Sequence, residues 1–303
     1  MRALRDSMTA TIQRHAIVLF NILQRASDSG ETLDLFRLLN RFTFEAFAEI
    51  ALVSAWASRL VLENPAVAGS GVEGELKKDI EVINATVLGV EKALARRCPT
   101  VVPGSSPNAE NQQSDPMYLR DIVVNFLIAG RDTTAQTLSW FFLNLTKNPH
   151  VETAIRSEIM EKFHETGVEG TDATNATMQD VSQLVTLEAA LKETLRLHPP
   201  VPMVPKYAKS LIVLATYAMA RMQQVWGPAA AEFKPERWID STTGKLVSML
   251  EMKLVVVGLL SRFHIEVQDP EKVTYEVSLT LPVKGSLDVK ISRATSPTEP
   301  AFA

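Results

Sequence analysis

The sequence has little of what several common classes of protein require. Cys98 is the only cysteine, so the chain can form no internal disulfide bond, which fits a reducing compartment. The five histidines form no pair at metal-ligand spacing, so the sequence predicts no metal site made of protein ligands alone. Basic residues do not predominate, since the 31 Lys and Arg are outnumbered by 35 Asp and Glu. We therefore expect no nucleic-acid partner.

Long hydrophobic runs and a secretory leader are also missing. The longest apolar run near the end, Leu254–Leu260, is too short to cross a bilayer, and the first fifteen residues are polar and charged. We therefore expect no membrane-spanning segment in this chain. The composition is otherwise ordinary for a globular protein with a core, with 46% hydrophobic and 22% charged residues.

Hydrophobic periodicity predicts a mainly α chain with a small antiparallel β portion. The first 60 residues read mostly as helix, and further helices are expected at 75–97, 117–146, 150–165, 178–197 and 250–263, with a short one at 217–226. Strands are expected at Leu211–Ala215 and, as a hairpin, at Val273–Leu281 with Leu287–Ile291. Residues 98–116 are rich in proline and polar residues and predict a linker or loop, and residues 294–303 predict a flexible tail.

The segment 117–146 is apolar on nearly all sides and therefore predicts a buried helix. Asp132 lies in its middle, where a carboxylate is costly unless it is hydrogen-bonded or functional. Ala129 and Gly130 just before it would let a ligand approach the backbone closely. In the alternative interpretation, Gly130 ends one helix and Thr133–Gln136 is a capping box that starts another.

A second pattern is Glu193-Thr-Leu-Arg196, whose charged ends share one face of a helix. On its own, this spacing is most simply a solvated pair worth a few tenths of a kcal/mol. Downstream lies Phe233-Lys-Pro-Glu-Arg-Trp238, which adds Arg237 as a further cation. The planar guanidinium group can bond a carboxylate through two parallel hydrogen bonds.

Along the chain, Ala129-Gly-Arg-Asp-Thr-Thr-Ala135 comes first, followed by Glu193–Arg196 and then by Phe233–Trp238. These three motifs in this order resemble the cytochrome P-450 superfamily of haem-thiolate monooxygenases. The resemblance covers most of residues 115–293 and is closest to the fatty-acid ω-hydroxylase branch. It implies one partial domain of the family over residues 1–303. By this resemblance the chain is expected to start after the membrane anchor and the first haem-contacting helix. Residues 206–211 are expected to skip a hairpin of the family.

The resemblance also implies roles for single residues. Ala129 and Gly130 would shape the groove beside the haem, and Asp132 and Thr133 would be catalytic, as proton relay and as hydrogen-bond donor to bound oxygen. Glu193 and Arg196 would bond Arg237 and lock the core, which is a structural role.

The implied reaction inserts one oxygen atom from O2 into a C–H bond of a fatty acid or similar lipid. The cofactor would be haem (heme), and electrons would come from an NADPH-dependent reductase. The family's usual location is the membrane of the endoplasmic reticulum. Without an anchor segment, a cytoplasmic location is the alternative expectation.

One element of the family pattern is missing. The loop Phe-x-x-Gly-x-Arg-x-Cys-x-Gly, whose cysteine binds the haem iron, should follow the third motif, but Ser241–Ser248 runs directly into Met249–Lys253. Cys98 could in principle supply a thiolate, but its place in a proline-rich loop indicates an ordinary free thiol. Two alternatives therefore stay open. One is a catalytically inactive truncated relative, from a splice form or a faulty gene model, and the other is a haem-free helical interaction protein.

Overall fold

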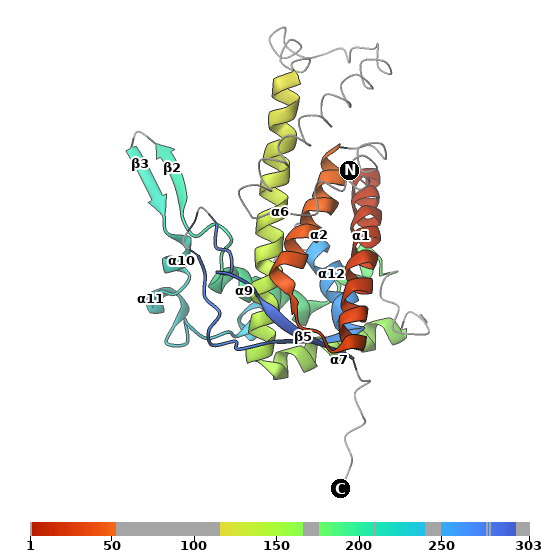
Figure 1. Ribbon diagram of the computed structural model, residues 1–303. Coiled ribbons are helices and arrows are strands. Elements are labelled where there is room, and N and C mark those ends of the chain that lie inside the picture. The colour runs from red at the N-terminus through yellow and green to blue at the C-terminus, as the bar shows by residue number, and fades with distance from the viewer. Residues whose placement is uncertain are drawn as a thin grey trace. The chain divides into compact units, whose positions relative to one another are not determined.

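The computed structural model describes residues 2–52, 116–165, 176–208, 210–239, 250–276, 278 and 280–294 (Figure 1). The chain divides into two compact units, a larger one of Met1–Thr43 with Asp132–Ala303 and a smaller one of Phe44–Arg131. The predicted helix at 75–97, most of the predicted linker and tail, Cys98 and the junction after Ser248 lie outside the described residues.

The described residues are mainly helical, which confirms the predicted fold class. The helices are α1 (Arg2–Ser29), α2 (Leu35–Leu52), α6 (Pro116–Lys147), α7 (Pro149–Glu165), α8 (Met178–Ser182), α9 (Val185–Leu197), α10 (Thr216–Met219), α11 (Gln223–Trp226), α12 (Leu250–Leu260) and the 3-10 helix η3 (Pro235–Trp238). The strands are β1 (Leu33–Asp34), β2 (Val204–Ala208), β3 (Ser210–Leu214), β4 (Phe263–Val267) and β5 (Asp288–Arg293). No helix among these ranges is both long and apolar enough to span a membrane.

The larger sheet corrects the predicted hairpin of Val273–Leu281 with Leu287–Ile291. Its strand order is β1-β5-β4, and all pairs are antiparallel, so β5 pairs with β4 and not with the segment that precedes it. In that segment the described residues form only an isolated bridge, between Tyr275 and Val283. The reason is burial, since the buried residues Phe263, Ile265 and Val267 of β4 alternate with exposed ones, and Ile265 and Val267 pair with the buried Ile291 and Val289 of β5.

The predicted helix at 178–197 is two helices. Thr177 caps α8 through a capping box with Asp180, and the helix ends at Ser182. The chain restarts as α9, whose first turn is capped from another helix. The Glu158 carboxylate of α7 accepts hydrogen bonds from the backbone N–H groups of Thr186 (2.8 Å) and Leu187 (3.1 Å). A carboxylate at this end satisfies unpaired donors and complements the helix dipole.

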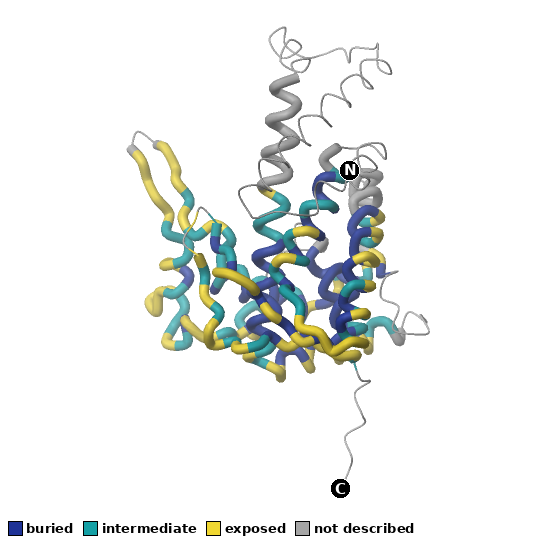
Figure 2. The backbone as a smooth tube through the Cα atoms, in the orientation of Figure 1, coloured by how far each residue is buried: buried dark blue, intermediate teal, exposed yellow. Residues whose placement is uncertain are grey.

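Helix α12 lies within the core of the larger unit, against α1, α8 and β4 (Figure 2). Its one buried cation, Lys253, is 1% exposed and donates hydrogen bonds to the carboxylate of Glu188 (2.7 Å) and to the Leu184 carbonyl (3.1 Å). Burial lowers the pKa of Lys253, and the Glu188 carboxylate acts in the opposite direction. The pair therefore joins α12 to the first turn of α9.

Gly258 sets the distance between α1 and α12. A Cβ atom added there would lie 3.0 Å from Cε2 of the Phe20 ring and closer still to its Cζ, and Phe20 is itself buried. The glycine thus allows the aromatic ring of α1 to lie directly on the backbone of α12.

We expect Gly258→Ala to lower the free energy of unfolding by about 1–3 kcal/mol, because the new methyl group overpacks a filled site. Chemical denaturation measures the change. Phe20→Leu in the same chain should recover part of the loss, since it removes the ring atoms that clash. A Gly258→Ala chain as stable as the parent, or a double variant with fully additive losses, would contradict this packing.

Candidate functional site

The most highly bonded group in the described chain is the carboxylate of Glu193 on α9, which is fully buried. Arg196, one turn later, donates to both of its oxygens, from Nη2 to Oε1 (2.8 Å) and from Nε to Oε2 (2.9 Å). From η3 come Arg237 Nε to Oε1 (3.3 Å) and Trp238 Nε1 to Oε2 (2.9 Å). The backbone N–H of Lys234 completes the set at 2.9 Å. Two separate sequence motifs therefore meet on one carboxylate.

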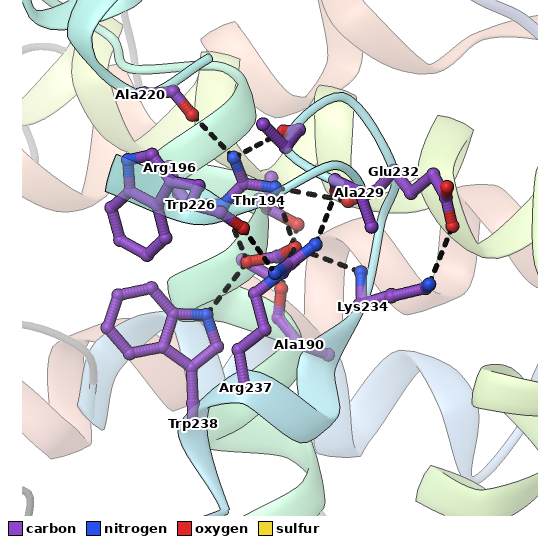
Figure 3. A network of polar contacts seen from close by, with 12 residues as sticks. Ala190, Thr194, Arg196, Ala220, Trp226, Ala229, Glu232, Lys234, Arg237 and Trp238 are labelled. Carbon is purple, nitrogen blue, oxygen red and sulfur yellow. Dashed lines mark hydrogen bonds and ion pairs between the residues drawn. The ribbon is translucent and has the colours of Figure 1, made fainter. Parts of the chain in front are cut away.

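The two arginines use their remaining donors on backbone carbonyls (Figure 3). Arg196 donates to the carbonyls of Ala220 (2.5 Å), Ala230 (2.7 Å) and Glu232 (3.0 Å). Arg237 donates to those of Trp226 (3.1 Å) and Ala229. These carbonyls lie in residues 220–232, where α11 is the one short helix, so the arginines supply partners that regular secondary structure would otherwise provide. We call the contacts of Glu193, Arg196 and Arg237 the α9–η3 network.

Two tryptophans enclose this network. The guanidinium of Arg196 lies over the Trp226 ring at 5.0 Å, and the rings of Trp226 and Trp238 are 5.8 Å apart. The aromatic faces limit access of water to the ion pairs and add a cation–π attraction. Trp238 was visible at the end of its motif, but nothing in the sequence indicated that its indole N–H would reach Glu193.

Burial alone would raise the pKa of Glu193, because it penalises the charged form. The hydrogen bonds from Arg196, Lys234 and Trp238 outweigh this effect, and the pKa lies below its ordinary value. A lowered carboxyl pKa stabilises the fold above the pKa of the unfolded chain, and this contribution is lost as the pH falls through the folded-state pKa. Glu193 is therefore ionised near neutral pH and acts as the anionic centre of the network.

The other predicted residues lie along α6, which is continuous from Pro116 to Lys147. This continuity excludes the alternative in which Gly130 ends a helix and Thr133–Gln136 starts another. Ala129 is exposed, whereas Gly130, Asp132 and Thr133 are half-buried, so Asp132 is less enclosed than the apolar sequence around it predicted.

One side of Gly130 is already filled. Within the smaller unit, a Cβ atom on Gly130 would lie 2.6 Å from Cε1 of the Phe47 ring of α2, so the glycine makes room for that ring. The next residue, Arg131, lies over the ring of Phe44 at 5.6 Å. The predicted role of Ala129 and Gly130 in forming a ligand groove stays a prediction.

Beyond Thr133, α6 is joined to the chain near residue 281. Gln136 donates to the Thr280 hydroxyl (3.0 Å) and accepts from the backbone N–H of Leu281 (3.2 Å), while Trp140 donates its indole N–H to the Leu281 carbonyl (2.9 Å). Trp140 also stacks on His198 with ring centroids 4.4 Å apart. Burial, aided by the charge of Arg221, lowers the pKa of His198 to about 3, so this histidine is a neutral packing residue.

The described residues hold no group of three or more His, Cys, Asp or Glu side chains that could bind a metal ion. Of the residues predicted from the sequence, the structure brings Glu193, Arg196 and Arg237 together in one network. It places Ala129, Gly130, Asp132 and Thr133 within little more than one turn of α6.

Comparison with known proteins gives a consistent result. The sequence model of the family described as Cytochrome P450 matches residues 105–287. The chain is similar to Cytochrome P450 94C1 of Arabidopsis thaliana (36% identity, covering 59% of this chain and 43% of that protein) and to Cytochrome P450 CYP94D108 of Paris polyphylla (30%, 90% and 68%). Alkane hydroxylase MAH1 of Arabidopsis thaliana is 32% identical over 58% of this chain and 40% of its own length.

A solved structure shares the fold. The crystal structure of a cytochrome P450 named CYP102L1 matches with a TM-score of 0.71 and 18% sequence identity, over 96% of this chain and 78% of that one. Among the curated relatives, the chain covers 43% of Cytochrome P450 94C1 and 40% of Alkane hydroxylase MAH1, so it spans less than half the length of these two proteins.

Glu193→Ala should cost about 3–5 kcal/mol of folding free energy, because it leaves two buried or partly buried arginines without their counter-charge. The matched control is Glu232→Ala, which breaks an ion pair with Lys234 whose side chains are 60% and 47% exposed and should cost less than about 1 kcal/mol. Urea denaturation of both variants compares them. Equal losses in the two variants would show that the α9–η3 network does not stabilise the folded chain.

Proposed function

The chain belongs to the cytochrome P450 family, and we propose that it carries the helical body of a monooxygenase for fatty acids or similar lipids in a form that does not bind haem through a thiolate. The lipid-like substrate is supported by the resemblance to the fatty-acid hydroxylase branch. It is also supported by the similarity to a protein named as an alkane hydroxylase. A complete, active form would take electrons from an NADPH-dependent reductase.

The family binds haem, and the residues that the structure describes do not fit that group. The chain's single cysteine is Cys98, which lies outside the described residues, so the described part offers no thiolate. It also offers no cluster of other metal-binding side chains. The family's cysteine loop is missing between Ser248 and Met249. This sequence feature carries the proposal.

The residues of α6 keep the family pattern although the ligand loop is missing. We assign Asp132 the transfer of protons at its carboxylate and Thr133 the donation of a hydrogen bond from its hydroxyl, both in a form of the protein that contains the loop. Ala129 and Gly130 would face the cofactor there. The partial exposure of Asp132 and Thr133 supports this assignment, since a relay must exchange protons with water.

A haem-free interaction protein is the second candidate function. One observation favours it, the apolar surface of the β2–β3 hairpin, which is exposed although its residues are typical of a buried strand.

The absorbance spectrum of the purified chain tests the main proposal. After reduction and treatment with CO in the presence of haem, we expect no thiolate-type Soret band and no hydroxylation of fatty acids, because the family's cysteine loop is missing from the sequence after Ser248. Inserting the cysteine loop of Cytochrome P450 94C1 between Ser248 and Met249 should restore the band. The matched control carries the same loop with alanine in place of its cysteine and should stay without it.

Two outcomes would contradict the proposal. A thiolate-type band in the unmodified chain that disappears in Cys98→Ser would show that Cys98 binds the iron. A colourless chain after insertion of the loop would show that the helical body is not that of a haem enzyme lacking one ligand.

A further inference from the structure

Strand β4 lies at one edge of the three-stranded sheet, because the strand order is β1-β5-β4. Its outer side is bonded to two helices instead of to a further strand. Arg156 of α7 donates from Nη2 to the carbonyl of Phe263 (2.7 Å), and the Thr146 hydroxyl of α6 accepts from the backbone N–H of Val267 (3.1 Å). An uncovered edge strand offers its unpaired backbone groups to another chain. Helices α6 and α7 therefore protect this edge of the sheet.

One buried carboxylate holds that arginine in place. Glu152 of α7 is 5% exposed, and its Oε1 atom accepts hydrogen bonds from Arg156 Nε (2.8 Å) and Nη2 (2.5 Å). The same oxygen lies 2.9 Å from Nδ1 of His264 on β4. Arg156 also donates to the carbonyl of Leu260, the last residue of α12. We call Glu152, Arg156 and His264 the β4 clasp, since they connect α7 to the end of α12 and to the start of β4.

His264 is the member of the β4 clasp that titrates near neutral pH. Its side chain is 50% exposed, so it exchanges protons with water. The hydrogen bond to the Glu152 carboxylate raises the pKa of His264 above its ordinary value, against the opposing effects of burial and of Arg156. Glu266, on the same face of β4, also raises the pKa of His264, and Lys290 of β5 lies opposite Glu266.

We propose that the β4 clasp is a pH-sensitive device that loosens the edge of the sheet as the pH rises through neutrality. Protonated His264 donates from Nδ1 to the carboxylate that also holds Arg156, so two cations on one anion hold β4 against α7. A histidine whose pKa is raised by folding stabilises the fold fully below the pKa of the unfolded chain, which is about 6.5. This contribution is lost as the pH rises through the folded-state pKa. The proposal requires no haem and is therefore independent of the function proposed above.

Hydrogen exchange of the whole chain, followed by mass spectrometry, tests the β4 clasp. After correction for the intrinsic pH dependence of exchange, a peptide covering β4 should be protected about two- to fivefold less at pH 8 than at pH 6. A change of one pKa unit corresponds to a factor of about ten, and the exposure of His264 to solvent reduces this effect.

Two variants separate the charge of His264 from its packing. His264→Gln is neutral at both pH values, so the β4 peptide should show the lower protection at both. His264→Lys carries a charge at both pH values, so the higher protection should persist at pH 8. The matched control is His150→Gln, which removes an exposed histidine of α7 outside the β4 clasp and should leave the pH dependence of the parent chain intact.

Three outcomes would overturn the proposal. The β4 peptide could be equally protected at pH 6 and pH 8, or its pH dependence could persist in His264→Gln. Nuclear magnetic resonance could also show the His264 imidazole titrating at or below about pH 6.5, in which case the Glu152 carboxylate does not hold its proton. This last measurement needs only the parent chain, so it decides the question even where a variant does not fold.

Discussion

A single buried carboxylate determines how the segment after α9 folds. Glu193 would be strongly destabilising if its charge were unpaired, because burial removes it from water. Five donors from Arg196, Arg237, Trp238 and the Lys234 backbone satisfy it. The arginines that neutralise it also bond five backbone carbonyls between residues 220 and 232. The network therefore stabilises the irregular backbone of this stretch, because the short helix α11 within it supplies few backbone hydrogen bonds of its own.

The same helix is also fixed at its other end. Glu158 of α7 caps the first turn of α9, and Lys253 of α12 bonds both Glu188 and the Leu184 carbonyl. Each of these contacts uses a charged group on one element and a backbone or charged group on another. Helix α9 thus connects α7, α12 and η3 in the larger unit. Charged groups bond it to these three elements near both of its ends.

The sequence was most informative where the determining forces are local. Continuous apolar periodicity placed α6 and α7 within a few residues, and the spacing of Glu193 and Arg196 put both on one helical face. The break between α8 and α9 could not be predicted, because Glu158 comes from another helix. The pairing of β5 with β4 was likewise decided by a distant partner, and the bond from Trp238 to Glu193 depends on how η3 lies against α9. These are tertiary effects that override local pattern.

The interactions that hold this fold are separate from the residues to which chemistry is assigned. Three sets of contacts connect different elements of the protein to one another. They are the α9–η3 network, the Lys253–Glu188 pair, and the hydrogen bonds of Gln136 and Trp140 to Leu281. Asp132 and Thr133 lie about one turn before Gln136 on α6, on a part of the helix that is only half-buried. None of these contacts involves a residue of Ser241–Met249, where the family's ligand loop would be expected. The contacts that stabilise the described fold are therefore separate from the segment in which the family's haem ligand would be expected.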